Sequence, residues 1–386
     1  MKSKLIRTAT VAMSLDLLLK GQLDFLNENY NVIAVSGEDN HLLQVKEREK
    51  VNTVDISLKR EISPIKDLIS LVRLFILFKK EKPLIVHSIT PKAGLLSMIA
   101  AYFARVPVRI HTFTGLVFPS KNRALQQLLI TMDRMLCKCA TNVYPEGEGV
   151  KNDLIQFKIT SKPLKVIANG NINGIDLEHF NPENISEASS QKLSTSLGIE
   201  TNDFVFIFIG RLVADKGINE LIAAFSKLSK QKNNIKLLLV GPFEQEIDPI
   251  SKETLLEIQN NLNIISTGYQ EDIRNYLDLA KVLVFPSYRE GFPNVVLQAG
   301  AMGLPSIVTN INGCNEIIKD NYNGIIIPIK NEITIFDAMQ LVLEDKKKLL
   351  FLQSNARASI EARFDQQVVW KAILEEYKIV TDNVYK

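Results

Sequence analysis

Residues 290–298 (EGFPNVVLQ) combine a carboxylate, a glycine and a helix start directly after an apolar run. A strand that runs into such a turn predicts a helix from Pro293, because proline is favoured at the first helical position. The helix start offers free backbone N–H groups and a positive dipole end, which suit a phosphate or an anionic leaving group. Glu290 before the helix and Gln298 inside it would face one ligand. Taken alone, the segment is explained equally well as an ordinary strand–loop–helix connection.

A second candidate loop, residues 210–217 (GRLVADKG), also follows a fully apolar run and precedes a predicted helix. Gly210 and Gly217 let the backbone approach a ligand closely. A diphosphate would be held there by forked contacts from Arg211 and a point charge from Lys216. The loop lacks the Gly-Lys-Ser/Thr ending of a Walker A motif. Taken alone, it is also explained as a surface turn with solvated charges.

These loops must be positioned by a larger scaffold. Apolar, β-branched runs alternate with helical patterns nearly throughout the 386 residues, and this alternation predicts parallel sheets covered by helices on both faces. The length favours two domains, and about six strand–helix units per half predict two doubly wound α/β domains. The predicted strands are residues 5–11, 31–36, 53–57, 84–89, 109–114, 142–144 and 165–168, then 204–209, 236–240, 264–267, 282–285, 306–309 and 324–327. The Asn/Gly-rich residues 169–174 are the predicted linker.

The charge differs between the two halves. Residues 1–180 carry 25 basic and 17 acidic side chains, a net +8, whereas the remainder carries 21 and 26, a net −5. The basic half suits an anionic lipid or a diphosphate-bearing substrate. Nucleic acid is not expected as a partner, because the basic residues are dispersed and no recognition motif accompanies them.

Cysteine usage and hydropathy predict a cytoplasmic protein. The three cysteines, Cys137, Cys139 and Cys314, match no zinc or redox spacing and fit a reducing compartment. The longest apolar run, residues 93–104, is shorter than a membrane span. Asp16 interrupts the apolar N-terminal region, which favours a first β-strand over a signal peptide.

Read together, residues 210–217 and 290–293 resemble the corresponding loops of glycosyltransferase family 4, whose members are retaining enzymes of GT-B fold that use nucleotide sugars. The resemblance covers essentially the whole chain. It includes residues 313–316 (GCNE), the Asn323-Gly324 turn, and residues 87–94 and 111–115 in the first half. It implies an acceptor-binding domain over residues 1–170, a donor-binding domain over 171–362, and a final helix over 363–386 that packs on the first domain.

The resemblance also implies roles for particular residues. Arg211 and Lys216, with Gly210 beside them, hold the donor diphosphate and stabilise it as it leaves, while Glu290 lies near the transferred sugar. The sugar and phosphate pocket is lined by the backbone of Gly291, Phe292, Pro293 and Asn294. Catalysis is assigned to Glu290, Arg211 and Lys216, and the departing phosphate oxygen takes the acceptor proton.

This chain departs from the family pattern at two positions. Gln298 stands where relatives carry a second glutamate that contacts the ribose, and glutamine can still donate and accept hydrogen bonds there. Thr114 stands where many relatives carry a histidine. Either Thr114 contacts the sugar through its hydroxyl, or His111 takes over part of that role. His87 is a further candidate, although a lone histidine near a strand is more often structural.

No cofactor or metal ion is expected, because the sequence holds no Asp-x-Asp and no His/Cys cluster with metal spacing. The expected reaction moves a hexose or N-acetylhexosamine from a UDP-sugar to a polyprenyl-diphosphate-linked saccharide, for a capsule, O-antigen or similar polysaccharide. A non-hydrolysing sugar-nucleotide epimerase and an inactive donor-binding subunit are the alternatives.

Residues 64–80 combine apolar and basic side chains in a helical pattern. The favoured interpretation is a helix that covers a sheet with its basic residues outward. The alternative is a helix that rests on an anionic membrane surface. The resemblance adds weight to membrane contact, and the expected location is the inner face of the cell membrane, with peripheral attachment.

Overall fold

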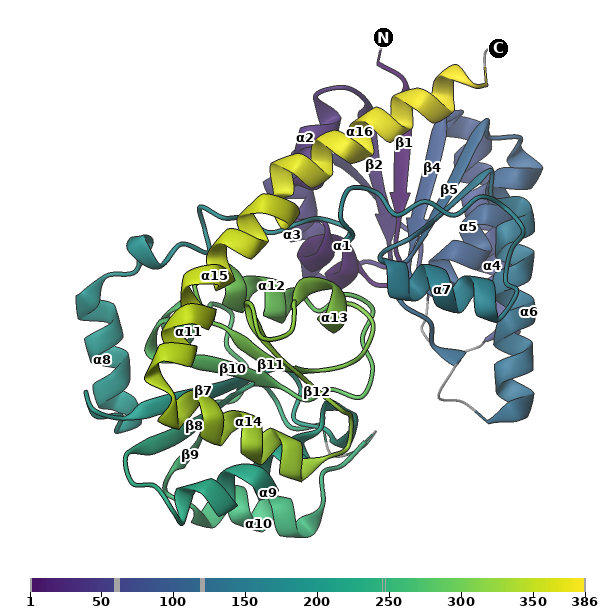
Figure 1. Ribbon diagram of the computed structural model, residues 1–386. Coiled ribbons are helices and arrows are strands. Elements are labelled where there is room, and N and C mark those ends of the chain that lie inside the picture. Colours follow the sequence, from purple (N-terminus) through teal and green to yellow (C-terminus); the bar gives the residue numbers. More distant parts are fainter. Residues whose placement is uncertain (1, 59–62, 119–121, 245, 247, 385–386) are drawn as a thin grey trace. The chain divides into compact units, whose positions relative to one another are not determined.

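The computed structural model describes residues 2–58, 63–118, 122–244, 246 and 248–384. The chain forms two compact units, residues 1–174 with 366–386 (unit 1) and residues 175–365 (unit 2) (Figure 1). The sequence predicts divisions after residues 170 and 362. Each unit contains one six-stranded sheet in which every strand pair is parallel, and the predicted doubly wound α/β class is therefore confirmed.

Unit 1 has the strand order β3-β2-β1-β4-β5-β6. Its strands are β1 (Lys4–Thr8), β2 (Asn31–Ser36), β3 (Asn52–Asp55), β4 (Ile85–Ile89), β5 (Val108–Phe113) and β6 (Asn142–Pro145). Its helices are α1 (Ala12–Leu18), α2 (Gln22–Asn27), α3 (Asn40–Glu49), α4 (Pro64–Glu81), α5 (Pro91–Ala104), α6 (Arg123–Cys139), α7 (Glu148–Gln156) and α16 (Gln366–Asp382). Two apolar cores form, one under α4, α5 and α6 and one under α1, α2, α3 and α16.

Unit 2 has the strand order β12-β11-β10-β7-β8-β9. Its strands are β7 (Phe204–Ile209), β8 (Ile235–Val240), β9 (Ile264–Ser266), β10 (Val282–Phe285), β11 (Ser306–Thr309) and β12 (Gly324–Ile327). Its helices are η2 (Pro182–Asn184), α8 (Glu187–Leu197), η3 (Ala214–Lys216), α9 (Ile218–Ser229), α10 (Lys252–Asn260), α11 (Arg274–Leu279), α12 (Asn294–Ala301), α13 (Cys314–Ile317), α14 (Glu332–Glu344) and α15 (Lys346–Phe364).

Local sequence explains where these elements start. The central strands are apolar on both faces because helices cover both sides of each sheet, as in β7, where five of six residues are buried. Several helices begin with a side chain that accepts a hydrogen bond from the first turn. These caps are Asp39, Asn122, Ser186, Ser251, Asn331 and Asp345.

The segment that follows α7 differs from the prediction. Residues 165–168 do not form a strand, since Ala168 has a left-handed φ of 52° and takes part only in an isolated bridge. The predicted linker is also ordered within unit 1. Asn173 is buried, its side chain donates to the Lys20 carbonyl, and it accepts a hydrogen bond from the Trp370 indole at 2.7 Å. These long-range contacts fix a segment that composition alone describes as a hinge.

Helix α4 packs on the core with basic residues outward, as in the favoured interpretation, but its outward side is also partly apolar. Ser70, Leu74 and Phe78 face the core, but the side turned to solvent carries exposed isoleucines as well as basic residues. The helix is nevertheless too polar to span a bilayer, and no other helix in the described part of the chain meets the length and hydropathy that a span requires.

Candidate functional site

Both predicted loops of unit 2 begin at neighbouring strand ends. Residues 210–217 follow β7, and residues 286–290 follow β10, which pairs with β7 in the sheet. The strand order reverses between these two strands, and doubly wound sheets bind ligands at the carboxyl ends of strands on either side of such a reversal. The sheet therefore brings together two segments that lie about 75 residues apart in the sequence.

Glycines allow the two loops to pack against each other. Gly217 has a φ of 72°, and a Cβ added there would lie 2.2 Å from the carbonyl oxygen of Pro286. Gly210 has a φ of 150°, and a Cβ on the adjacent Gly241 would lie 1.8 Å from the Gly210 oxygen. A larger residue at Gly217 would push the two loops apart, and one at Gly241, which follows β8, would displace Gly210.

Lys216 and Glu290 form an ion pair between these loops. Their side chains are only 15% and 16% exposed, and the ammonium also lies 5.6 Å from the centre of the Phe285 ring. Charges that are largely withdrawn from water interact strongly with each other and with any ion that binds beside them. The contact places the predicted phosphate-binding cation beside the predicted sugar-facing carboxylate.

Arg211 does not join this pair. Its guanidinium is 46% exposed and donates to Glu244 at 2.6 Å. The sequence does not indicate Glu244 as a site residue, because it lies in no motif and comes near Arg211 only through the pairing of β8 with β7. An exposed ion pair of this kind is weak, so the arginine can exchange its partner for a ligand at little cost.

Further polar contacts, which the sequence does not indicate, hold the loop after β10. The Tyr288 backbone N–H donates to the Asp215 carbonyl at 2.9 Å, and the Tyr288 hydroxyl donates to Glu220 at 2.6 Å. Burial and the neighbouring Glu220 raise the pKa of Tyr288, so the phenol stays protonated. Arg289 pairs with the Asp215 carboxylate at 3.1 Å. The two loops are thus joined at several points beside the Lys216–Glu290 pair.

The start of α12 differs slightly from the prediction. Pro293 is the residue before the helix, because its ψ of 108° is extended, and the helix begins at Asn294. Phe292 is buried and packs edge-on against Phe364, with 5.5 Å between ring centres. Its side chain therefore anchors the loop in the core, and only its backbone is available to a ligand. Gln298 lies within α12, half-buried, and its side chain makes no hydrogen bond with the described residues.

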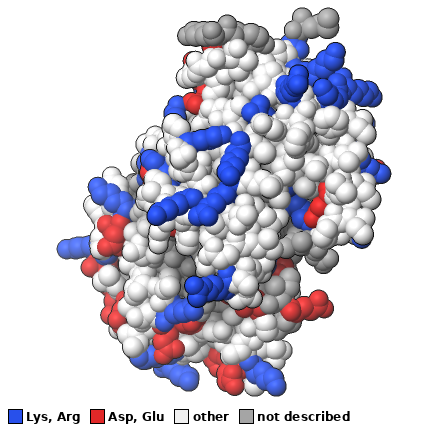
Figure 2. Space-filling model, turned by 90° about the vertical axis from the view of Figure 1, so that its right-hand side faces the viewer, with Lys and Arg blue, Asp and Glu red and all other residues white. Residues whose placement is uncertain are grey.

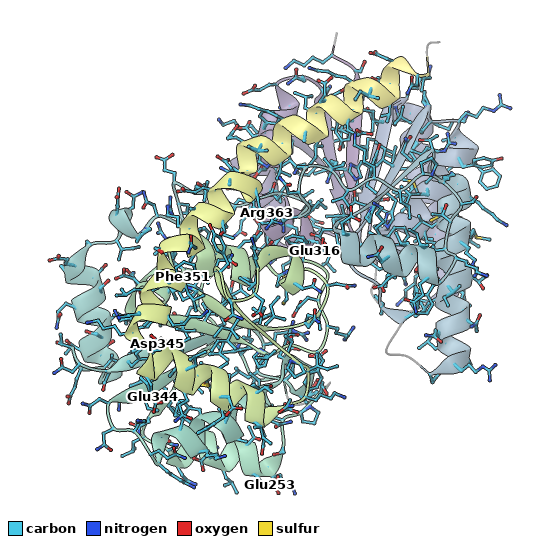
Figure 3. All side chains as sticks on the ribbon, in the orientation of Figure 1. Glu253, Glu316, Glu344, Asp345, Phe351 and Arg363 are labelled. Carbon is cyan, nitrogen blue, oxygen red and sulfur yellow. The ribbon has the colours of Figure 1, made fainter. Side chains whose placement is uncertain are left out.

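The loop before α13 packs against the same segment. A Cβ on Gly313, which has a φ of 74°, would lie 2.5 Å from the Gly291 oxygen. Glu316 accepts a hydrogen bond from the Gly313 N–H at 3.2 Å, and its own carbonyl accepts one from Arg363 at 2.6 Å (Figure 3). Cys314 is buried here, and burial raises the pKa of its thiol well above the ordinary range. A reactive thiolate is therefore not expected.

The two histidine candidates in unit 1 are interior residues. His87 is 2% exposed, and both ring nitrogens have partners: Nδ1 contacts Tyr377 at 2.6 Å, and Nε2 contacts Thr112 at 2.8 Å. His111 contacts Ser88 at 2.9 Å, and burial lowers its pKa to about 3. Both rings are therefore neutral. Thr114, by contrast, is half-buried and follows the carboxyl end of β5.

A largely apolar cavity of about 380 Å³ lies in unit 1 at the equivalent strand reversal, after β1 and β4. Its polar lining includes Thr10, Thr90 and Asp133, and its apolar lining includes Val11, Leu95, Val117, Leu129 and Met132. Thr90 has a φ of 68°, a strained value for a β-branched residue, and strain of this kind gathers at ligand sites. Burial raises the pKa of Asp133 to about 7. Sequence patterns did not reveal this cavity.

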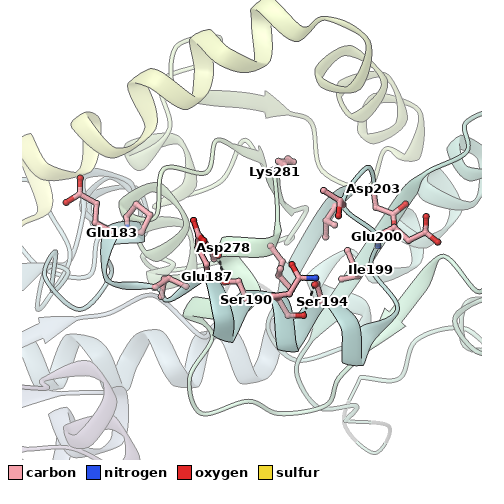
Figure 4. A pocket seen from close by; sticks show the side chains of 15 residues that line it. Glu183, Glu187, Ser190, Ser194, Ile199, Glu200, Asp203, Asp278 and Lys281 are labelled. Atoms are coloured by element: carbon pink, nitrogen blue, oxygen red, sulfur yellow. Dashed lines mark hydrogen bonds between the residues drawn. The ribbon is translucent and has the colours of Figure 1, made fainter.

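Unit 2 also holds a cavity of about 560 Å³, which Figure 4 shows from close by. Asp278 and Lys281 precede β10, and Asp203 precedes β7, so this cavity lies at the amino ends of the strands. The predicted loops lie at the opposite ends. The cavity is therefore separate from the candidate site.

Comparisons with known proteins agree with this arrangement. A family model of group 1 glycosyl transferases matches residues 189–359, and a model described as glycosyl transferase 4-like matches residues 12–146. The capsular polysaccharide biosynthesis glycosyltransferase CapM of Staphylococcus aureus is 31% identical over 97% of this chain and 96% of its own length. This chain belongs to the group 1 glycosyltransferases. The matched ranges place the 210–217 and 290–298 loops of this glycosyltransferase in the group 1 part.

Further comparisons give one more similar sequence and two similar folds. A UDP-Gal:alpha-D-GlcNAc-diphosphoundecaprenol alpha-1,3-galactosyltransferase of Escherichia coli is 33% identical over 80% of this glycosyltransferase and 79% of its own length. The fold resembles Alr3699/HepE of Anabaena, solved with UDP and glucose, with a TM-score of 0.82, 19% identity, and coverage of 97% and 99%. A UDP-N-acetylglucosamine 2-epimerase also shares the fold, with a TM-score of 0.63, 14% identity, and coverage of 92% and 91%. Fold alone therefore does not separate transfer from epimerisation.

Proposed function

We propose that this glycosyltransferase moves a hexose or N-acetylhexosamine from a UDP-sugar, with retention, to a saccharide carried on polyprenyl diphosphate. The product would be a capsule, O-antigen or similar surface polysaccharide, assembled at the inner face of the cell membrane. The observation that carries the proposal is the ion pair of Lys216 and Glu290 at the strand reversal of unit 2.

The donor diphosphate would bind beside Lys216, and Arg211 would leave Glu244 to contact it. The N–H groups at the start of α12 would supply further hydrogen bonds to the phosphate oxygens. Gln298 would contact the ribose, since its side chain makes no hydrogen bond with the described residues and lies on the helix that starts at the phosphates. The E. coli relative is named for a UDP-Gal donor, which supports a uridine diphosphate donor here, and HepE, which has a similar fold, was solved with UDP and glucose.

In the reaction, the bond between the anomeric carbon and the diphosphate oxygen breaks, and a bond to the acceptor oxygen forms on the same face of the sugar. The acceptor proton moves to the leaving phosphate oxygen, so UDP is released. Lys216 and Arg211 stabilise the charge that develops on the diphosphate, and loss of one such contact typically costs about 10²–10³ in rate. Glu290 lies next to Lys216 and would orient the transferred sugar. No metal ion or cofactor takes part in this scheme.

Unit 1 would bind the acceptor at the cavity after β1 and β4. Its apolar lining fits the lipid-proximal part of the acceptor, and Thr114 after the neighbouring β5 fits a sugar contact better than the buried His111 does. The E. coli relative is named for an acceptor on diphosphoundecaprenol, which supports a lipid-linked acceptor here.

Product analysis tests the proposal. The purified protein is incubated with a panel of UDP-sugars, with and without a polyprenyl-diphosphate-linked saccharide, and every product is identified by mass spectrometry and NMR. The expected result is an acceptor extended by one α-linked sugar, with one UDP released per transfer. A changed sugar on UDP without acceptor would identify an epimerase. A donor that binds but never reacts would identify an inactive binding subunit.

A further inference from the structure

Helix α4 exposes a continuous apolar stripe on unit 1. The side chains are 77%, 60%, 50%, 49% and 58% exposed at Ile65, Leu68, Ile69, Val72 and Ile76. Their spacing of three, four and seven residues places them along one side of the helix. The opposite side packs on the core. A monomeric protein rarely leaves such a stripe in water, so this side of the helix is a candidate interaction surface.

Basic side chains border the stripe. Lys66, Arg73 and Lys80 recur every seven residues, so they form a row along one edge of it, and all three are exposed. At the end of the helix, Lys79 and Lys82 line a cavity of about 490 Å³ together with Arg105 from the end of α5. Figure 2 views unit 1 from the side of α4, α5 and α6 and shows basic side chains gathered over its upper part, with few acidic ones among them.

The two carboxylates of α4 do not offset this charge, because other cations already neutralise them. Asp67 pairs with Lys92 at 2.9 Å, and Glu81 pairs with Lys4 at 2.7 Å. The basic row therefore keeps its positive charge, and none of its three members forms an ion pair with a described residue.

We infer that the stripe, the basic row and the basic cavity together form the surface with which this protein binds an anionic lipid bilayer. Helix α4 would lie flat, with the stripe in the boundary between headgroups and acyl chains and the cations on lipid phosphates. The last turn of α5 exposes Tyr102 and Phe103 beside the same cavity, and aromatic residues favour that boundary.

Charge favours a bilayer over a second copy of this chain as the occupant. Two copies that met through the stripe would bring two rows of Lys66, Arg73 and Lys80 close together. The repulsion would oppose the apolar contact, and no free carboxylate on α4 would relieve it. An anionic bilayer offers apolar chains to the stripe and phosphates to the basic row at the same time.

The start of α4 lies near the proposed acceptor cavity, within the same unit, whereas the basic cavity lies at the amino ends of β1, β4 and β5. The Lys92–Asp67 ion pair joins the first turn of α4 to the cavity lining, because Lys92 is itself a lining residue. Docking through α4 would therefore hold that cavity close to the lipid carrier. Only this last step depends on the proposed function, since lipid binding itself requires neither donor nor acceptor.

Vesicle sedimentation tests the surface. Vesicles of phosphatidylcholine, alone or with phosphatidylglycerol, are mixed with the protein without donor or acceptor. One variant removes the basic row (Lys66→Gln, Arg73→Gln, Lys80→Gln), and another removes part of the stripe (Ile65→Gln, Ile69→Gln, Ile76→Gln). The matched control removes three exposed lysines of unit 2 (Lys192→Gln, Lys346→Gln, Lys347→Gln) and changes the net charge equally. UDP titration of every variant monitors the donor site independently.

Wild type is expected to bind the phosphatidylglycerol vesicles and to bind phosphatidylcholine alone much more weakly. Each basic side chain near an anionic surface contributes about fivefold, so the row variant should lose about 10²-fold and the control almost nothing. The stripe variant should lose a similar factor, at about fivefold for each exposed isoleucine. UDP binding should be unchanged throughout.

Several results would overturn the inference. The control could lose as much binding as the row variant, or the stripe variant could bind like wild type. Light scattering could also show that wild type is a dimer and the stripe variant a monomer, while neither of these two proteins binds vesicles. Transfer activity without vesicle binding would refute only the lipid-binding surface. Vesicle binding without transfer activity would refute only the proposed function.

Discussion

Replacing Glu290 by glutamine should separate donor binding from turnover. Glutamine keeps the shape and a hydrogen bond to Lys216 but removes the negative charge that now faces this lysine. In the proposed complex the diphosphate also lies beside Lys216, so the carboxylate and the phosphates repel each other. The substitution should therefore tighten UDP binding while it slows transfer, because the residue that orients the sugar is altered.

The size of the effect follows from the low exposure of the pair. Two like charges about 6 Å apart, at an effective dielectric constant of about 20–40, repel by about 1–3 kcal/mol. UDP affinity should therefore rise by about 5–100-fold. The kcat should fall by about 10²-fold, the lower end of the range for loss of one transition-state contact.

Isothermal titration with UDP and steady-state kinetics with donor and acceptor measure the two effects. Glu253→Gln is the matched control, since Glu253 is an exposed residue in the first turn of α10 and gives the same change in net charge. Weaker UDP binding by Glu290→Gln, in proportion to its loss of turnover, would refute the reasoning. The Lys216–Glu290 pair would then only hold the loops together.

Three further predictions concern other parts of the protein. Gln298→Ala should raise the donor KM with little change in kcat, whereas Gln298→Glu should lower the donor KM or leave it unchanged. If the alanine variant binds UDP as tightly as wild type in a titration, Gln298 does not contact the ribose. Transfer should survive exhaustive EDTA treatment, and activity that is lost and then restored by Mg²⁺ or Mn²⁺ would contradict the metal-free scheme. Asp133 keeps a proton in the folded state up to about pH 7 but loses it near pH 4 when unfolded, so its contribution to stability falls as pH rises through that window. Asp133→Asn should therefore unfold at a higher temperature than wild type at pH 8, by about 2–4 kcal/mol in stability, and this gain should vanish near pH 4; a gain that does not vary with pH would contradict the assignment.

Periodicity and composition predict the scaffold well because they act locally. Apolar runs such as residues 204–209 are strands wherever helices cover both faces of a sheet, and the two glycine-bearing loops are recognisable because close packing excludes larger residues at Gly217. The strand predicted over residues 165–168 is wrong for the same reason. The segment has strand-like composition, but the six-stranded sheet is complete without it.

Long-range contacts could not be predicted in this way. His87 lies 290 residues from Tyr377, and only the return of α16 to unit 1 shows that the histidine ring is enclosed. Glu244 reaches Arg211 across two strand ends without a motif to mark it. The sequence does not show that the outward side of α4 is apolar, because the same apolar residues could face either the core or the solvent. These features depend on contacts between residues that are far apart in the sequence, and a local sequence pattern does not show such contacts.

Binding of a nucleoside diphosphate by unit 2 is central to the proposed function, and titration of UDP into three proteins measures it. These are wild type, the double variant Arg211→Ala with Lys216→Ala, and a control, Lys192→Ala with Lys346→Ala, in which two exposed lysines of the same unit are removed. Wild type and the control should bind one UDP per chain with equal affinity, and the double variant should bind at least about 10²-fold more weakly, at about 1.5–3 kcal/mol per charged contact. No UDP binding by wild type, or equal binding by the double variant, would contradict the proposed function.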